Sequence, residues 1–592
     1  MKELSRGTIP ETLNSGRSIR ARFGESSFLR IDRELPFLCV YCQPDRIDEG
    51  TRALVTNEAS YLQVGRADSA TDLVAEVVSA LEPSFGAFLV LKVKAYEGVA
   101  FQIKSGKDTQ LQQLGVRLAE FLRQVCPDPV EILDTKPGLK VPPEALCLEL
   151  HVPTFYQSDE GVAYPLVLRN FRRRFTRATR KLFHHFILNF TPLKPASFHT
   201  LGPRAIVKSV WEVDAALEEV SRSFSFLLQV TPTNIEQSWR AFKRDHYKVE
   251  PEFVYRPFPV EPTLLKRALF NIPIEKVEDA SLHHIFQEKQ RQIELKIAMA
   301  ERRRTRDFLH GSLSLYGGVS PELRQQAEEL LDFLPHYCPE VETGHLTAEE
   351  FARMAQDEIA YYQKQYDGFQ PRVIVRDDLE SAVLCDRGNL LIGARASVAK
   401  VRAAPLIHHE IGTHLVTYYN GKAQKLKQLS LGLADFLELQ EGLAVLSEFL
   451  SGPLSRQRMQ MLALRVVAVD MMISGAGFVE TFAELRSRCK ISLRTIYELV
   501  VRVYRGGGFT KDAVYLRGLV ALLRELGRGM ELEPLFVGKI ARHHVPLVKE
   551  LQHRRILEPA PLKPRILSLP EAKERLAVIQ QGVSITDLCR FA

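Results

Sequence analysis

The sequence predicts an α+β protein in which a mainly helical domain with one short β region follows an α/β domain. Three observations support this class. Up to about residue 190, apolar runs typical of strands alternate with segments of helical periodicity. From about residue 210 onward helical periodicity dominates, and only residues 372–393 resemble a β region. The length of 592 residues also exceeds that of one ordinary domain of about 150 residues.

Composition and charge narrow the functional classes. Apolar residues make up 45% and charged residues 26% of the chain, as in ordinary globular proteins. The net charge of +7 is small for a nucleic-acid-binding protein of this size, so we do not expect nucleic acid as a partner. The cysteines are too sparse for a disulfide framework, and the polar start lacks the apolar core of a secretory signal. We therefore expect a cytoplasmic protein.

A membrane span is not expected either. The most apolar stretch, residues 459–478, contains Arg465 and Asp470. Charged side chains are costly in the hydrocarbon core, so a buried helix is the better interpretation.

We expect three segments along the chain. These are a flexible lead-in over residues 1–25, an α/β domain over residues 26–190 and the mainly helical domain over residues 205–592. A proline-containing stretch at 189–204 separates the two domains. Within the α/β domain the patterns predict strands at 35–42, 86–95 and 145–152, and helices at 70–81 and 110–125.

One segment of the α/β domain is strongly basic. Residues 169–181 carry seven basic side chains and no acidic one. Apolar residues nevertheless recur there at helical spacing, so we expect an amphipathic helix with its apolar face in a core and its basic face in water. The apolar positions are Phe171, Phe175, Ala178, Leu182 and Phe186.

The short β region directly precedes the most informative motif of the chain. Strand-like runs at 372–376, 382–385 and 390–393 surround a DRGN turn. We expect the segment 390–398 to present an edge along which a substrate peptide adds as a further strand.

The segment LIHHEIGTHLVTYYNG, residues 406–421, carries His409, Glu410 and His414 on a predicted helix. A catalytic zinc site needs three protein ligands of the His/His/carboxylate kind, an open position for water, and a carboxylate that takes the water proton. A Glu directly after the first His is a common source of that carboxylate. The segment therefore predicts a metal site with Glu410 as the base.

The two histidines are one residue further apart than in the usual helical zinc motif. On a regular α-helix, residues i and i+4 lie about 40° apart around the axis, whereas i and i+5 lie about 140° apart. His409 and His414 share a face only if the helix contains an extra residue, as in a π-type bulge. We expect that distortion at Gly412, where a glycine makes it least costly.

A second apolar helix, residues 439–450, offers the third ligand. Glu441 and Glu448 are seven residues apart and lie within about 20° on the same face, so either carboxylate can complete the set. Gly442 beside Glu441 would let two helices approach closely. Further along, Asp470 is expected either to support a ligating histidine or to pair with a neighbouring helix.

These motifs resemble those of a known family. HEIGTH at 409–414 and QEGLA at 440–444 are similar to the bacterial QEGLA-motif proteins, described as flavohaemoglobin expression-modulating, and to their eukaryotic relatives, the MATCAP-type tubulin tyrosine carboxypeptidases. The resemblance extends to GGFTKDAVYLRG at 507–518 and covers roughly residues 210–560.

The resemblance implies a zinc-dependent metallopeptidase with one zinc ion per chain. His409, His414 and Glu441 would bind the ion, and Glu410 would be the catalytic base. The fold expectation accordingly becomes a mainly helical metallopeptidase domain with a short β region.

Residues 506–518 supply a candidate anion site. Three glycines predict a turn, and Thr510 is a good N-cap for a helix whose free N–H groups favour an anion. Lys511 opposes the helix dipole there, which favours a bound anion such as a terminal carboxylate. Tyr515 shares its face and is expected to steady the oxyanion, whereas Arg517 is the weaker candidate for the carboxylate. We therefore expect a metallocarboxypeptidase that acts on the C-terminus of a peptide or protein.

Two other functional classes remain open from the sequence. One is a metallo-amidohydrolase that acts on a small amide, with the N-terminal domain shaping the pocket. The other is a regulator of gene expression in which the metal is structural. An open position on the metal would favour an enzyme, whereas salt-dependent DNA binding with an inert metal would favour the regulator.

Overall fold

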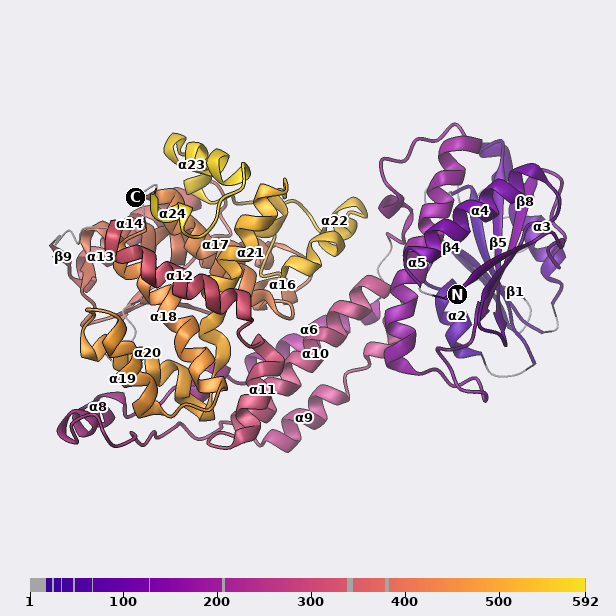
Figure 1. The fold of residues 1–592 in the computed structure, drawn as a ribbon. Helices are drawn as coiled ribbons and strands as arrows, with labels where there is room; N and C mark the ends of the chain where they lie inside the picture. Colours follow the sequence, from indigo (N-terminus) through magenta and orange to yellow (C-terminus); the bar gives the residue numbers. More distant parts are fainter. Residues whose placement is uncertain are drawn as a thin grey trace. The chain divides into compact units, whose positions relative to one another are not determined.

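The computed structural model describes residues 18–590 apart from 24–25, 33–34, 46–47, 67, 127, 205–207, 338–343, 378, 380–382 and 453. The chain divides into two compact units (Figure 1). Unit 1 comprises Met1–Trp211, Pro273–Ile285 and Lys549–Leu557, and unit 2 comprises Glu212–Ile272, Phe286–Val548 and Glu558–Ala592. Two segments that follow the first part of unit 2 in the chain, one near its middle and one near its end, thus belong to the first unit.

Unit 1 is built on an eight-stranded mixed sheet with the order β1-β2-β4-β3-β5-β8-β6-β7. The four central strands β4, β3, β5 and β8 run parallel, and β2 and β6 flank them in the antiparallel direction. The strands are β1 (Ile19–Phe23), β2 (Ser27–Ile31), β3 (Phe37–Cys42), β4 (Ser60–Val64), β5 (Phe88–Tyr96), β6 (Phe101–Lys104), β7 (Val130–Leu133) and β8 (Ala145–Pro153). The parallel centre explains why β3, β5 and β8 read as continuous apolar runs.

Helices cover both faces of this sheet. They are α2 (Glu49–Val55), α3 (Ala70–Leu81), α4 (Thr109–Arg123) and α5 (Pro165–Phe190). Apolar residues of α3 pack in one core, and those of α2, α4 and α5 pack in the other. Unit 1 is therefore a three-layered α/β domain, as the alternating patterns predict.

The basic segment lies inside α5, and its amphipathic character is confirmed. The five apolar positions named above are all buried. The ring of Phe183 on the same helix stacks on Phe37 of β3, with the centroids 3.9 Å apart. Not every basic side chain faces water, however, because Arg180 is buried and its Nε donates to Glu58 Oε2 over 3.2 Å.

Part of the expected flexible lead-in is a strand. Residues 1–17 and 24–25 lie outside the described residues, but Ile19–Phe23 form β1 and pair antiparallel with β2. Ile19 and Ala21 are buried, whereas Arg20 and Arg22 between them are exposed. This alternation is the period of a strand with one buried face.

Unit 2 is mainly helical, so the predicted α+β class holds. Its helices, three of which begin or end in segments of unit 1, are α6 (Lys208–Arg222), α7 (Phe226–Val230), α8 (Ile235–Arg244), α9 (Pro262–Phe270), α10 (Ala280–Glu301), α11 (Arg306–Tyr316), α12 (Pro321–Tyr337), α13 (Ala348–Gln363), α14 (Lys400–His409), α15 (Val416–Ala423), α16 (Gln428–Leu431), α17 (Phe436–Ser451), α18 (Arg456–Ile473), α19 (Phe478–Arg488), α20 (Leu493–Tyr504), α21 (Val514–Gly527), α22 (Val545–His553), α23 (Pro570–Gln580) and α24 (Asp587–Arg590). Among the described residues, none of these helices combines the length and apolar character needed to cross a membrane.

The short β region forms a three-stranded sheet with the order β10-β12-β11. The strands are β10 (Val373–Arg376), β11 (Val383–Asp386) and β12 (Asn389–Gly393). β12 pairs in parallel with β10 and antiparallel with β11, so it is the middle strand. The expectation of an open edge over 390–398 is therefore wrong. Beyond it, β13 (Val398–Ala399) is also paired, with β9 (His345–Leu346).

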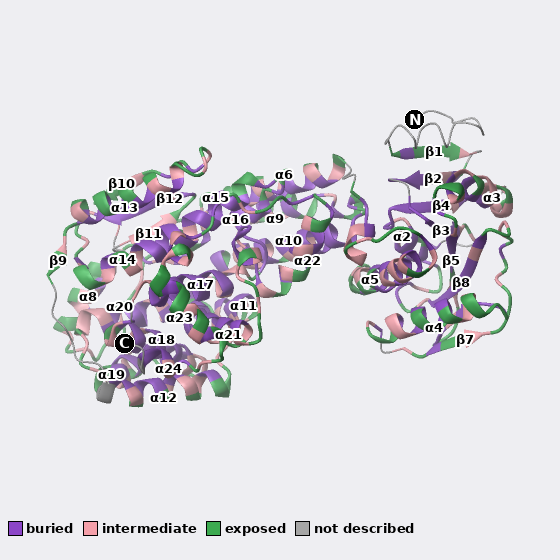
Figure 2. Ribbon diagram, turned by 90° about the horizontal axis from the view of Figure 1, so that it is seen from above, coloured by how far each residue is buried: buried purple, intermediate pink, exposed green. Residues whose placement is uncertain are grey.

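The centre of unit 2 is α17, which is buried along almost its whole length (Figure 2). It packs against α14 and α21. Gly442 and Gly518 make the close approach to α21 possible. A Cβ atom on Gly442 would lie 2.6 Å from the carbonyl carbon of Gly518, and one on Gly518 would lie 2.1 Å from the carbonyl oxygen of Glu438. Gly442 thus serves the contact with α21.

We predict that Gly518→Ala destabilises the protein, because its Cβ would overlap backbone atoms that cannot move independently. The free energy of unfolding should fall by about 1–3 kcal/mol, as in other overpacked cores. Chemical denaturation followed by circular dichroism measures this change. Gly452→Ala, at the end of α17, is the matched control, since a Cβ there meets nothing within 4 Å. Equal stability of both variants would show that the helix crossing is not tight.

Candidate functional site

The metal motif lies where a helix changes its winding. α14 ends at His409, Glu410–Leu415 form a π-helical turn, and α15 begins at Val416. Because a π-helix holds more residues per turn than an α-helix, residues five apart come to one side. The rings of His409 and His414 accordingly have their centroids 5.0 Å apart. The distortion predicted from the spacing is confirmed.

Of two neighbours of the histidine pair, Gly412 is not required by packing, whereas His408 packs against another helix. Gly412 lies in the π-helical turn, as expected, but a Cβ there would only make ordinary contacts of 3.6 Å with His408 and Tyr362. Space therefore does not require the glycine. His408 lies against α13, with its Nδ1 3.8 Å from Glu358 Oε1, and burial lowers the pKa of His408 to about 4.

α17 brings a carboxylate to the two rings. Glu441 Oε2 lies 3.7 Å from His414 Nε2 and 4.0 Å from His409 Nε2, and the three donor atoms lie within 4.8 Å of one another. In a tetrahedral zinc site with bonds of about 2.0–2.2 Å, neighbouring donor atoms are about 3.3–3.5 Å apart. Small shifts would bring these donors to that spacing, so their number, chemistry and arrangement fit a zinc ion.

Glu410 lies beside the three donors. Its carboxylate is buried, and its Oε1 is 3.9 Å from His409 Nε2, the same nitrogen that faces Glu441. This is the placement expected of a carboxylate that accepts a proton from water at the metal.

Glu448, the alternative third ligand, supports His409 from its other side. Its Oε1 lies 2.7 Å from His409 Nδ1, and Arg458 donates to both of its oxygens over 2.6 and 3.0 Å. Burial alone would raise the pKa of Glu448, but Arg458 and His409 hold it well below its ordinary value. An ionised Glu448 accepts the Nδ1 proton, which leaves the Nε2 lone pair of His409 for a metal.

The second histidine has a weaker support. His414 Nδ1 lies 3.5 Å from Gln440 Oε1, which also accepts the hydroxyl proton of Thr417 over 2.8 Å. Gln440 thus orients His414 from within the QEGLA segment, next to the candidate ligand Glu441.

Lys511 and Tyr515 lie at the site, but Lys511 contacts a candidate ligand. Its buried Nζ donates to Glu441 Oε1 over 3.1 Å and lies 3.5 Å from the Tyr515 hydroxyl. Burial opposes ionisation of Glu441, yet the Lys511 ammonium and the two histidines hold its pKa well below the ordinary value. Lys511 therefore keeps Glu441 ionised and directs its Oε2 toward His409 and His414.

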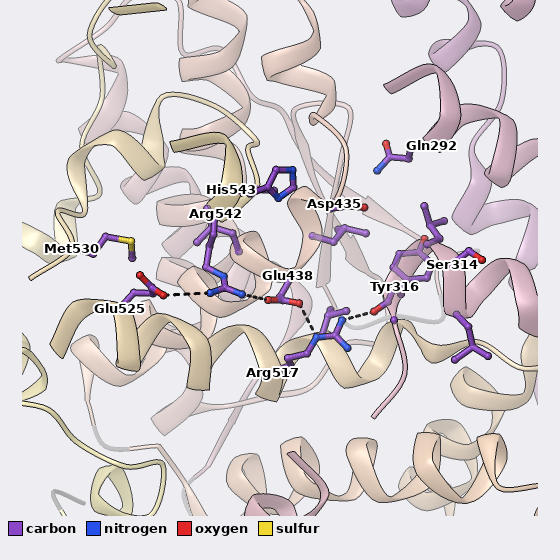
Figure 3. A pocket seen from close by; sticks show the side chains of 17 residues that line it. Gln292, Ser314, Tyr316, Asp435, Glu438, Arg517, Glu525, Met530, Arg542 and His543 are labelled. Carbon is purple, nitrogen blue, oxygen red and sulfur yellow. Dashed lines mark hydrogen bonds and ion pairs between the residues drawn. The ribbon is translucent and has the colours of Figure 1, made fainter. Parts of the chain in front are cut away.

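Arg517 lies apart from the three donors, in a cavity of about 650 Å³ (Figure 3). Its Nε donates to Glu438 Oε2 over 2.7 Å, its Nη1 donates to the carbonyl of Gly318 over 2.9 Å, and its Nη2 donates to the carbonyl of Tyr316. Arg542 bonds the other oxygen of Glu438. Because these groups already use the guanidinium, the structure offers no support for carboxylate binding by Arg517.

One local expectation around the site, the N-cap at Thr510, is wrong, and a second, the role of Asp470, had two alternatives. Thr510 is not an N-cap, because a 3₁₀ turn over Thr510–Ala513 precedes α21 and the Thr510 hydroxyl donates to the carbonyl of Ser312. Asp470 accepts from Arg324 of α12 over 3.0 Å. Of the two roles left open for Asp470, the structure shows the ion pair with a neighbouring helix.

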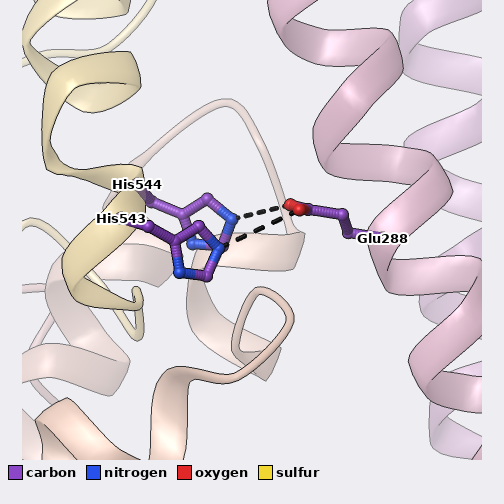
Figure 4. Close-up of side chains that lie close together, drawn as sticks. All are labelled: Glu288, His543 and His544. Atoms are coloured by element: carbon purple, nitrogen blue, oxygen red, sulfur yellow. Dashed lines mark hydrogen bonds and ion pairs between the residues drawn. The ribbon is translucent and has the colours of Figure 1, made fainter. Parts of the chain in front are cut away.

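A second group of possible metal donors is Glu288, His543 and His544 (Figure 4). The backbone N–H of Ala541 donates to His544 Nδ1, so the ring proton is on Nε2, which faces Glu288 Oε2 over 3.0 Å. A metal at Nε2 would need the lone pair that this proton occupies. The group is therefore an ordinary hydrogen-bonded cluster.

Sequence reasoning did not find Arg458, Arg402 or Lys539. Arg458 and Arg402 both approach Glu448, at 2.6 and 3.5 Å. The ammonium of Lys539 lies over the ring of Tyr418, 5.4 Å from its centroid. Arg458 and Lys539 lie on other elements than the metal donors, so no local spacing marks them. Arg402 lies seven residues before His409 on α14, and that helical spacing is the one signal that could have pointed to it.

One comparison with known proteins finds a family match over the part of the chain that contains this site. The sequence profile of the family described as microtubule-associated tyrosine carboxypeptidase (MATCAP) matches residues 240–583, a range that contains every site residue named above. Among solved structures, Trypanosoma cruzi metallocarboxypeptidase 1 is 13% identical and covers 63% of this chain and 99% of its own, with a TM-score of 0.33. A likeness at that score carries no argument. No curated protein matches the sequence.

The profile spans more than half of the chain and includes the histidine pair, the glutamate of α17 and the segment before α21. The chain belongs to the microtubule-associated tyrosine carboxypeptidase family.

Proposed function

We propose that unit 2 is a zinc-dependent carboxypeptidase that removes residues from the C-terminus of a peptide or protein. The observation that carries this proposal is the convergence of His409, His414 and Glu441 beside the carboxylate of Glu410. Membership of a carboxypeptidase family supports it.

The donor set favours zinc. Two imidazole nitrogens and one carboxylate oxygen are the ligands of many hydrolytic zinc sites, and a fourth position stays free for water or substrate. We propose one zinc ion per chain, held by His409 Nε2, His414 Nε2 and Glu441 Oε2. The ionised Glu448 behind His409 and the ammonium of Lys511 beside Glu441 would set the orientation of both ligands.

When bound, zinc would polarise the scissile carbonyl and make a water molecule more acidic. Glu410 then accepts the water proton and delivers it to the leaving amine. We propose that the hydroxyl of Tyr515 donates to the carbonyl oxygen as negative charge develops there. Lys511, 3.5 Å from that hydroxyl, would favour the same charge. Lys511 is thereby reassigned from carboxylate binding to the support of Glu441 and Tyr515.

We predict that Glu410→Gln keeps the metal and loses hydrolysis. The amide preserves the shape of the side chain but cannot accept the water proton, so kcat should fall by about 100- to 10,000-fold. Elemental analysis of the purified variant and chromatographic assay of peptide trimming measure the two quantities. Loss of metal in this variant would mean that Glu410 is itself a ligand.

His414→Ala and Glu441→Ala should each remove the metal at neutral pH, because two remaining protein ligands hold zinc poorly. Glu448→Gln is the comparison variant in which metal affinity should fall only partly. It leaves the three donors in place and should weaken metal affinity by about 10- to 100-fold. Competition with a chromogenic chelator measures all three affinities. Full metal occupancy in Glu441→Ala would transfer the third ligand to another residue.

The exopeptidase assignment predicts a preference for a free terminal carboxylate. We expect the zinc-loaded protein to trim a peptide that ends in tyrosine and to leave its C-terminally amidated twin intact. Mass spectrometry of both digests decides the question. Equal cleavage of the two peptides would rule out the carboxypeptidase assignment and leave the metal site untouched.

A further inference from the structure

Lys539 is a cation near the metal motif with no assigned role. Its backbone is fixed by two hydrogen bonds, from its N–H to the carbonyl of Leu429 over 2.8 Å and from the N–H of Leu433 to its carbonyl over 2.9 Å. The preceding Gly538 packs so closely that a Cβ there would lie 2.9 Å from the Leu429 carbonyl oxygen. The backbone from which the side chain of Lys539 extends is therefore held in place.

Two aromatic rings place the ammonium between the elements that carry the metal donors. The Nζ of Lys539 lies 5.4 Å from the ring centroid of Tyr418 and 6.0 Å from that of Phe436. Tyr418 follows His414 by one helical turn, and Phe436 begins the helix that carries Glu441. Cation–π contacts position a charge without neutralising it.

Among the described residues, the charge of Lys539 has no close counter-ion. In the described part of the chain, no hydrogen bond or ion pair is found for its Nζ. Burial lowers the pKa of Lys539, while the more distant groups Cys385, Asp386, Glu441 and Glu410 act in the opposite direction. The two ring contacts place the ammonium beside α15, which follows the segment of the proposed base, and beside α17, which carries the proposed carboxylate ligand.

Four other cations around the site differ from Lys539 in this respect. Lys511 bonds Glu441, Arg458 bonds Glu448 and Arg502 bonds Asp512 with two hydrogen bonds. Arg465 stacks on the ring of Tyr515, and its Nε lies 3.8 Å from Asp512. Each of these four cations has a carboxylate of the protein within 4 Å, whereas among the described residues none lies so close to the Nζ of Lys539.

An exopeptidase must recognise a carboxylate only one residue beyond the bond it cuts, about 3.5 Å further along an extended chain. A cation that binds this terminal carboxylate must lie close to the metal donors. Its charge must also not be neutralised by a carboxylate of the protein. Resting on the function proposed above, we infer that Lys539 binds the terminal α-carboxylate of the substrate. Lys539 would then be the residue that makes the enzyme specific for chain ends.

The test separates binding from cleavage. The Glu410→Gln protein, loaded with zinc, holds peptides without cutting them. A fluorescent peptide that lacks Asp and Glu and ends in tyrosine, and its C-terminally amidated twin, are titrated by fluorescence anisotropy. We expect Glu410→Gln to prefer the free acid by about 10- to 100-fold, and we expect Lys539→Met in the same background to abolish the preference.

The controls use matched substitutions. Lys422→Met removes another lysine whose ammonium lies over a tyrosine ring, 5.5 Å from the centroid of Tyr419, and should keep the preference. Lys539→Arg should restore at least part of it. Zinc content and melting temperature establish that each variant is folded, and Lys539→Gln replaces Lys539→Met if the latter fails to fold.

The outcomes distinguish the two proposals. If Glu410→Gln binds acid and amide equally, there is no carboxylate recognition, and both the exopeptidase function and the role of Lys539 are overturned. If it prefers the acid and the Lys539 variants keep that preference, only the role of Lys539 is overturned. Loss of the preference in Lys539→Met or Lys539→Gln alone, with rescue by arginine, supports it.

Discussion

The π-helical turn over Glu410–Leu415 is the constraint on which the candidate site depends. Because they are five positions apart, His409 and His414 would diverge on a regular α-helix, and no single ion could contact both. The turn places both rings on the side that faces α17 and keeps Glu410 beside them. A π-turn gives up regular α-helical hydrogen bonding, so its occurrence at this point is more informative than the histidines alone.

Around that turn, the two buried carboxylates of α17 are each paired with a buried cation. Glu448 accepts from His409 and Arg458, and Glu441 accepts from Lys511 while its other oxygen faces the histidines. An uncompensated carboxylate in such a buried place would favour its neutral form and would lose its use as a ligand or acceptor. The cations on α18 and before α21 thus preserve the chemistry of α17. The position of α17 in turn depends on the glycine contact with α21, which allows the two backbones to meet.

Much of the fold could be predicted because its local patterns agree with its long-range structure. The helices over 70–81 and 110–125 and the strands β3, β5 and β8 appear where the apolar periodicity places them. The failures concern relations between elements. Strand β12 reads as an exposed edge, but β10 and β11 pair with both of its sides. Ile19–Phe23 alternates as a strand does, but it lies in a polar stretch that the sequence analysis assigned to the lead-in. Only its pairing with β2 identifies it as a strand.

The sequence by itself determined the two histidines, the adjacent glutamate, two possible third ligands and the need for a distorted helix, since all of these follow from spacing along one or two helices. Helical spacing left Glu441 and Glu448 equivalent, and only the tertiary structure placed Glu441 at the Nε2 side of both histidines and Glu448 behind His409. It also joined Lys511 to Glu441 and placed Arg517 with Glu438. It alone brought Lys539 near the site, more than a hundred residues after His414. Periodicity shows which face of a helix or strand a residue occupies. Which other element packs against that face depends on how the helices pack, and residues from the whole chain determine that packing.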